Sequence, residues 1–196
     1  SSFLWRVPPT RSFNSAAKNP ALDSFLKDAD LDGRSFNAFM REAQVWSSVY
    51  GHVWIMVDKP KSNAGTRAQE LEQEIRPYVN MYTPENVLDW RYERTESGRF
   101  KLVYMKIMEM VDRLDETETI SYYRVWKEDT VELWMSGDEE EQMIQNEPNP
   151  LGRIPAVFLP AQHSTIRGIG TSDLSDAAYM QRAIYQELSE IEQLIR

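Results

Sequence analysis

The residues best suited to chemistry begin with a run of carboxylates. Segment 28–33 reads D-A-D-L-D-G, which matches the first half of a calcium-binding loop. The complete loop has a bidentate Glu at its twelfth position, and Phe39 stands there in this sequence. Because the strongest ligand is missing, we interpret the run as a turn, with Asp32 or Ser35 capping the helix that follows.

A glycine-rich segment is the second candidate. Segment 168–173 reads G-I-G-T-S-D, follows an expected strand and precedes an expected helix, as phosphate-binding loops do. The third glycine of the dinucleotide fingerprint is replaced by Asp173, whose carboxylate would repel phosphate, and the lysine of a P-loop is missing. We interpret the segment as a structural turn, with Ser172 capping the helix.

The sequence gives little support for catalysis or metal binding by histidine or cysteine. His52 and His163 are the only histidines, no His-x-x-x-His pair is present, and the chain has no cysteine. A Ser-His-Asp triad stays open because its members need only meet in space, but no Gly-x-Ser-x-Gly elbow supports one. We therefore predict no catalytic residue, no metal ligand and no cofactor, and we expect a protein that is not an enzyme. A hydrolase that uses acidic residues remains a third hypothesis, without support from spacing.

Aromatic and arginine residues alternate in two segments, 90–92 (W-R-Y) and 122–126 (Y-Y-R-V-W). Such strands can stack nucleobases. They are more often cross-strand pairs in a sheet, with arginine stems covering the rings. The negative net charge favours the second interpretation, because a negative surface repels phosphate.

Charge and composition set the class of protein. The 196 residues hold 22 Lys and Arg against 31 Asp and Glu, a formal charge of −9, and are enough for one globular domain. Eight acidic residues and no basic residue lie in 128–147, which leaves −1 for the remainder. We interpret the run 138–141 as a solvated loop, with a partner contact as the alternative. The longest apolar run, 53–57, is far shorter than the ~20 residues of a membrane span.

Hydrophobic periodicity predicts the α+β class: an antiparallel β-meander with flanking helices and a long C-terminal amphipathic helix. The meander should have about four strands, and 137–150 should be a break in it. The expected helices cover 20–28, 35–50, a segment from Thr66 to Pro77, and 173 to the chain end. The expected strands cover 52–57, 78–82, 88–93, 100–111, 119–127, 130–135 and 154–159.

The order of these segments resembles portal proteins of tailed bacteriophages. The resemblance begins with 30–35 (D-L-D-G-R-S), a helix, and then 50–60 (Y-G-H-V-W-I-M-V-D-K-P) and 76–90. Its most specific part is 151–158 (L-G-R-I-P-A-V-F) followed by 168–174 (G-I-G-T-S-D-L). The family often has a short Ile-Pro strand, a glycine-rich turn, Ser-Asp-Leu and a long helix. Each motif is a turn or cap pattern, so the resemblance depends on their order and spacing.

The resemblance implies a structural function. Portal subunits form a ring, usually twelve-fold, at one vertex of the capsid of the virion, and they assemble in the cytoplasm of the bacterial host. The ring nucleates head assembly with capsid or scaffold proteins, docks the terminase and the tail adaptor, and passes double-stranded DNA without sequence specificity. It has no active site of its own, and no membrane is involved.

Portal subunits are several hundred residues long, so the resemblance implies a piece of a longer chain. The first residues have neither a start Met nor a signal-peptide pattern, which indicates a cut or trimmed N-terminus. The expected parts are an N-terminal lead-in and short helix (1–33), a wing-like α+β domain (34–160), and the glycine-rich turn with the start of the long helix (161–196).

The terminal helix, 173–196, is the candidate surface for contact between subunits. Its candidate interface residues form one apolar stripe: Leu174, Ala178, Ile184, Tyr185, Leu188 and Ile191. The alternative function is a nucleic-acid or protein binding module that uses the aromatic-rich β-sheet.

Overall fold

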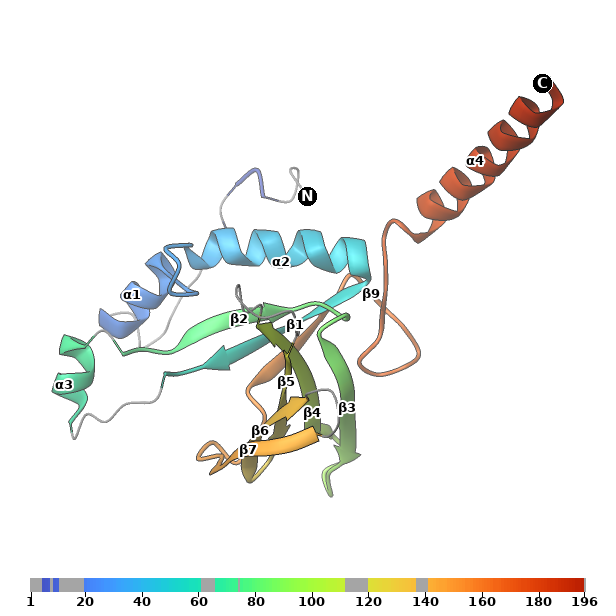
Figure 1. Cartoon of the computed structure of the whole chain (residues 1–196). Helices are drawn as coiled ribbons and strands as arrows, with labels where there is room; N and C mark the ends of the chain where they lie inside the picture. Colours follow the sequence, from blue (N-terminus) through green and yellow to red (C-terminus); the bar gives the residue numbers. More distant parts are fainter. Residues whose placement is uncertain are drawn as a thin grey trace. The chain divides into compact units, whose positions relative to one another are not determined.

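The structure, a computed structural model, describes residues 5–7, 9–10, 20–60, 66–73, 75–111, 120–136 and 141–195. It combines helices with antiparallel sheets, which confirms the predicted α+β class (Figure 1). The described residues form two compact units, one from residues 1–53 and 158–196 and the other from residues 54–157. The expected ranges 1–33, 34–160 and 161–196 differ from these units and stay a prediction.

The first unit begins with two helices. Helix α1 (Pro20–Lys27) and helix α2 (Phe36–Tyr50) are joined by the loop 28–35, and the rings of Phe25 and Phe36 lie 5.4 Å apart. One face of α2 is buried, at a spacing of four residues: Phe39, Ala43 and Ser47. Residues four apart lie on the same side of a helix, so these three residues form its buried face.

Helix α4 (Ser175–Ile195) closes the first unit and begins two residues later than predicted. A short hairpin precedes it, in which β9 (Gln162–His163) pairs with β10 (Gly170–Thr171). The sequence did not indicate this hairpin, since two-residue strands carry no measurable period. Among the described residues, no helix is both long enough and apolar enough to cross a bilayer.

A three-stranded sheet has the order β2-β1-β8, from β1 (His52–Asp58), β2 (Tyr78–Tyr82) and β8 (Ala156–Pro160). Strands β1 and β2 are antiparallel, with Trp54 opposite Tyr82. Residues 52–56 are all buried, as predicted for a strand covered on both faces, whereas Val57 is 40% exposed.

Helix α3 (Arg67–Glu72) lies between β1 and β2 in the chain. The Oγ1 atom of Thr66 accepts the backbone N–H of Gln69 at 3.4 Å, as the capping pattern predicted. The predicted end at Pro77 is wrong, because the helix stops five residues earlier, at Glu72.

The second unit contains a five-stranded antiparallel meander in which each strand pairs with the next along the chain (Figure 1). Its strands are β3 (Val87–Arg94), β4 (Phe100–Val111), β5 (Ile120–Lys127), β6 (Thr130–Ser136) and β7 (Glu141–Pro148).

Strand β7 corrects the prediction of a break over 137–150. Its residues are polar or exposed on both faces, so they show no alternation, and pairing with β6 makes the segment a strand. The acidic residues 138–140 lie outside the described part of the chain. Glu141, the last of that run, is the first residue of β7 and pairs with Ser136.

The core of the meander is aromatic and aliphatic. The buried ring of Trp54 lies 6.1 Å from that of Trp90 and 6.4 Å from that of Tyr92. A register shift between Arg91 and Tyr92 interrupts the β3–β4 pairing. It accompanies a break in the alternation expected along β4, where both Leu102 and Met105 are buried.

Candidate functional site

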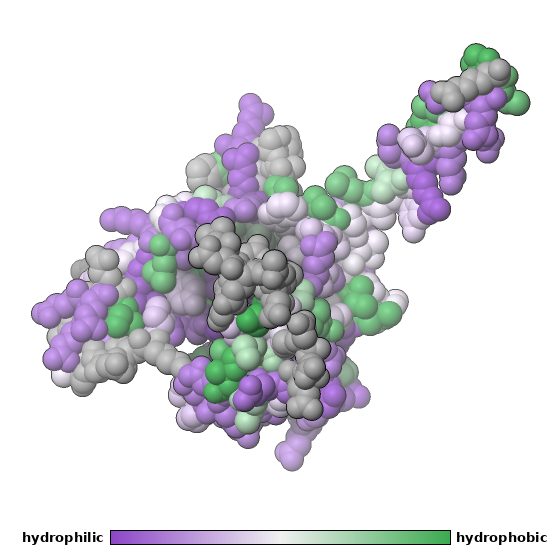
Figure 2. All heavy atoms as spheres, viewed as in Figure 1, coloured by the Kyte–Doolittle hydropathy of each residue, from purple (hydrophilic) through white to green (hydrophobic). Residues whose placement is uncertain are grey.

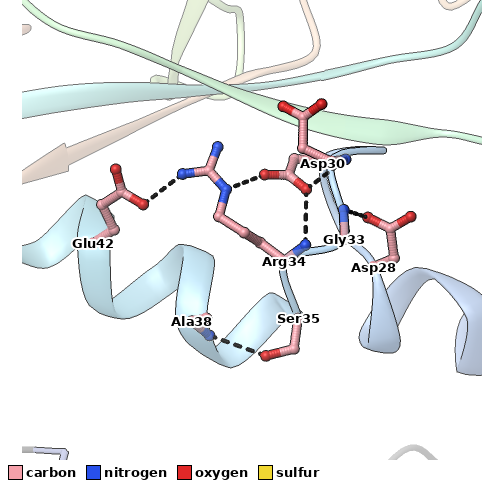
Figure 3. Close-up of polar contacts among 8 residues, drawn as sticks. Asp28, Asp30, Gly33, Arg34, Ser35, Ala38 and Glu42 are labelled. Atoms are coloured by element: carbon pink, nitrogen blue, oxygen red, sulfur yellow. Dashed lines mark hydrogen bonds and ion pairs between the residues drawn. The ribbon is translucent and has the colours of Figure 1, made fainter.

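The carboxylates of the calcium-like segment serve as hydrogen-bond acceptors within their own loop (Figure 3). The Oδ1 atom of Asp30 accepts the backbone N–H groups of Asp32 at 3.0 Å and Arg34 at 3.3 Å, and Oδ2 accepts the Arg34 guanidinium. Asp28 accepts the N–H of Gly33 at 2.9 Å. This geometry confirms the interpretation as a turn. No group of three or more His, Cys, Asp or Glu suited to a metal is found within the described residues.

The loop is also fastened to the helix that follows it. The second arm of Arg34 binds Glu42 on α2, with 2.5 Å between Nη1 and Oε2. Ser35 is the N-cap of α2, and its side chain accepts the N–H of Ala38 at 3.3 Å (Figure 3). The pair with Asp30 raises the pKa of Arg34. Burial alone would raise the pKa of Asp30, but the N–H of Asp32 and the Arg34 guanidinium outweigh it and lower that pKa.

The glycine-rich turn lies against the end of α2. The Nδ1 atom of His52 accepts the N–H of Gly170 at 3.3 Å, and the His52 ring lies 5.2 Å from that of Phe158. A Cβ on Gly170 would stand 2.1 Å from the carbonyl oxygen of Gly51, so the close approach of two backbones requires this glycine. The structural interpretation of the turn is confirmed, and burial lowers the pKa of His52.

The start of α4 is tied to α2 by polar contacts. The Oδ2 atom of Asp173 accepts the Ser48 hydroxyl at 2.9 Å, and Oδ1 accepts the Gln162 amide at 3.0 Å. The Ser172 hydroxyl donates to the Ser48 carbonyl at 2.7 Å and accepts the N–H of Leu174 at 3.1 Å. Ser172 thus bonds the chain just before the helix, which itself begins at Ser175.

Helix α4 presents the predicted interface stripe to its surroundings. None of its residues is buried, and Ile184, Leu188 and Ile191 are 50%, 57% and 51% exposed. Tyr185 is 71% exposed beside them. In Figure 2, hydrophobic residues alternate with hydrophilic ones along this helix, at the upper right. Among the residues that the structure describes, nothing buries the stripe.

The aromatic and arginine residues of the meander contact one another. Trp90 and Tyr92 pack on Trp54, as described above, and the Arg91 guanidinium lies 5.6 Å from the ring centre of Tyr104, its partner across the β3–β4 pair. The Arg91–Tyr104 contact agrees with the interpretation as cross-strand pairs covered by arginine stems, whereas Arg124 of the second segment pairs with carboxylates. A nucleobase would have to displace such contacts in order to stack there.

An ion-pair network surrounds Arg124, and the sequence did not predict it. Its guanidinium lies 3.5 Å from Asp58 on β1 and 3.2 Å from Glu109 on β4. The Tyr82 hydroxyl donates to Glu109 at 3.4 Å, and burial followed by the charge of Glu109 raises the pKa of Tyr82 to about 12. The only sequence signal is a charge in the middle of an aromatic strand, and it does not identify partners 66 residues away.

Comparison with protein-family profiles finds no match for this chain, and comparison with curated proteins finds none either.

Proposed function

We propose that the protein is a structural subunit of a phage portal ring at the capsid vertex. The ring, twelve-fold in the usual case, would form the channel for double-stranded DNA during packaging and ejection. It would also dock the terminase and the tail adaptor. The role is mechanical, so no side chain is assigned to catalysis.

The order of motifs supports this proposal, since each motif coincides with an element of the type that the resemblance implies. The Ile154-Pro155 pair precedes β8, the glycine-rich turn lies against the end of α2, and the S-D-L segment 172–174 leads into α4. These features are local, so their agreement supports the proposal through the sequence of segments along the chain.

The observation that carries the proposal is the exposed stripe of α4 on a fixed base. Ring assembly needs two different complementary surfaces on each subunit, because a head-to-tail contact must repeat until the ring closes. Asp173 and Ser172 hold the base of α4 against Ser48, while the apolar stripe beyond it is exposed. Water contact with so many apolar side chains favours their burial against another chain.

Electron microscopy of the complete gene product tests the proposal. We expect rings with a central channel, assembled without nucleic acid. Particles that remain monomeric at all concentrations, or that form closed dimers with two-fold symmetry only, would contradict it.

The charge distribution bears on DNA passage. Eight of the 31 acidic residues lie in 128–147 without a basic residue, so the remainder of the chain has a net charge of only −1. A nearly neutral channel would let DNA slide, because each cation paired with a phosphate adds affinity that must be broken at every step. The alternative is a sheet that binds single-stranded DNA. It requires an affinity, measured by filter binding, that falls steeply as the salt concentration rises. Such affinity in the isolated chain would favour the alternative over the ring.

A further inference from the structure

Helix α2 has an exposed apolar side in addition to its buried face. Val45 and Val49 are 38% and 43% exposed, and Arg41, one turn earlier, is an exposed cation. Residues four apart form a continuous row along a helix, so these three side chains make up one ridge, the α2 ridge. Among the described helical side chains, large apolar residues are exposed on α2 and α4 and on no other helix.

A second ridge of the same kind runs along the apolar stripe of α4. Ile184 and Leu188 are 50% and 57% exposed, and Glu192, the next residue at a spacing of four, is an exposed carboxylate. These three residues form the α4 ridge. Asp173 ties the base of α4 to Ser48 of α2, but no residue of α4 is buried, so α2 of the same chain does not cover the ridge.

The two ridges match in chemistry and charge when the helices run antiparallel. Along the chain, the α2 ridge is basic, apolar and apolar, and the α4 ridge is apolar, apolar and acidic. An antiparallel crossing therefore sets each apolar residue against an apolar one, and the acid against the base. The pairs are Ile184 with Val49, Leu188 with Val45, and Glu192 with Arg41. Packing of two rows spaced by four residues is the commonest way in which helices cross in globular proteins.

The charge on the α4 ridge disfavours its pairing with the same ridge of another copy. Two parallel copies would place Glu192 beside a second Glu192, and two antiparallel copies would place it beside an apolar side chain. Like charges at a helix pair repel, and a carboxylate packed on an apolar surface loses its hydration without gaining a partner. The α2 ridge offers Arg41 at that place, so it is the better partner.

We propose that the α4 ridge of one copy of this chain binds the α2 ridge of the next copy. The inference rests on the proposed function, for which it names the second of the two complementary surfaces. Because the two surfaces differ, each copy binds one neighbour through α4 and another through α2, which is the head-to-tail contact that a ring requires. A copy that lacks one ridge can still bind through the other.

Mixing two variants of the 196-residue chain tests the proposal. Ile184→Glu with Leu188→Glu removes the α4 ridge, and Val45→Glu with Val49→Glu removes the α2 ridge. In sedimentation velocity, we expect the wild type to associate, each variant alone to stay monomeric, and an equimolar mixture to form a dimer that grows no further. All four positions are exposed, so the melting temperatures should change little and show that both variants fold.

Three results would overturn the proposal. They are a wild-type chain that stays monomeric at every concentration, a Val45→Glu, Val49→Glu variant that associates like the wild type, and a mixture of the two variants that stays monomeric. The second of these is the result that pairing of α4 with α4 would give.

Charge reversal locates the contact along the two ridges. Arg41→Glu should weaken association about three- to tenfold at low salt, because it sets two carboxylates against each other. Glu192→Arg in the same chain should restore association, since the ion pair forms again with its charges exchanged. Glu190→Arg is the control, because residues two apart lie on different sides of a helix. Equal rescue by both would show an effect of net charge alone and would overturn the pairing.

The results also separate this contact from the portal ring. If electron micrographs of the complete gene product show rings that persist in Val45→Glu with Val49→Glu, the contact is overturned and the proposed function stands. If the mixed variants dimerise as expected but the wild type grows into open filaments, the contact is supported and the portal ring is contradicted.

Discussion

At the scale of single residues, segment 28–33 matches the first half of a calcium-binding loop, but its carboxylates stabilise a turn. Asp30 is 7% exposed and accepts two backbone N–H groups and the Arg34 guanidinium. Its partners are three nitrogen atoms of the same loop, the backbone nitrogens of Asp32 and Arg34 and the Nε atom of Arg34, so the carboxylate is engaged in holding the turn. The alternating aspartates are explained by the turn geometry of the loop.

Replacement of Asp30 should destabilise the protein strongly. Asp30→Ala leaves two backbone donors without their acceptor, and we expect a loss of about 2–3 kcal/mol in the free energy of unfolding. Asp32→Ala is the control, since Asp32 is an exposed carboxylate in the same turn. Urea denaturation followed by circular dichroism gives both values. Equal losses in the two variants would show that the Asp30 contacts contribute nothing specific.

The same residue gives the loop an acid dependence. The pKa of Asp30 is lowered in the folded state, so the unfolded chain binds the proton first as the pH falls. The stabilisation is therefore complete above about pH 4, the ordinary range of an aspartate, and is lost as the pH falls below it. Denaturation measured from pH 6 to pH 3 should show a smaller loss in Asp30→Ala than in the wild type. Parallel curves would contradict this assignment.

Alanine substitutions at Gly170 and Gly152 distinguish the cost of a steric clash from the cost of a strained backbone. Gly170→Ala would place a Cβ 2.1 Å from the Gly51 carbonyl oxygen, and we expect a loss of about 2–3 kcal/mol in stability. Gly152→Ala is the control, because Gly152 has φ of 58° and no atom within 4 Å of the added Cβ. It should lose only about 1–2 kcal/mol, the cost of left-handed backbone. Thermal unfolding of both variants measures the two losses of stability. A larger loss in Gly152→Ala than in Gly170→Ala would contradict the close approach of the two backbones.

At the scale of elements, His52 links the end of α2 to the hairpin before α4. Its Nδ1 atom must be unprotonated to accept the Gly170 N–H, and burial lowers the pKa of the ring. The unfolded chain therefore takes up the proton at higher pH than the folded one. The stability that the unprotonated ring contributes is therefore complete above about pH 6.5 and falls as the pH drops below it.

Hydrogen exchange at the Gly170 amide measures this weakening. We expect the protection factor of that amide, which already corrects for the pH dependence of chemical exchange, to show an extra several-fold loss between pH 7 and pH 5. In His52→Gln the extra loss should vanish, since glutamine does not titrate in this range. His163→Gln, which leaves His52 in place, should keep it. A pH-independent protection factor in the wild type would contradict the role of His52.

Elements with a strong local period were predictable. Helix α2 follows the period of 3.6, and β4 has the predicted bounds although a register shift breaks its alternation of buried residues. Strand β7 was missed because both of its faces are exposed, so only its pairing with β6 distinguishes it from a loop. Nor could the sequence pair Arg124 with Asp58, since strand order and register bring them together. The turn at Gly170 was predicted, but its contact with Gly51 depends on tertiary structure.

At the scale of the whole molecule, the apolar stripe of α4 is the surface at which the proposed contact between subunits is tested. Ile184→Glu with Leu188→Glu places two charges on the stripe, and we expect loss of the assembled species in sedimentation velocity. The melting temperature of the monomer should change little, because α4 buries no side chain and exposed substitutions alter stability by about 0.5 kcal/mol or less. Gln186→Glu with Gln193→Glu is the control, since it adds the same charge to the other side of the helix and should still assemble. If both double variants assemble, or if neither does, the stripe is not the contact between subunits and the ring must close through another surface.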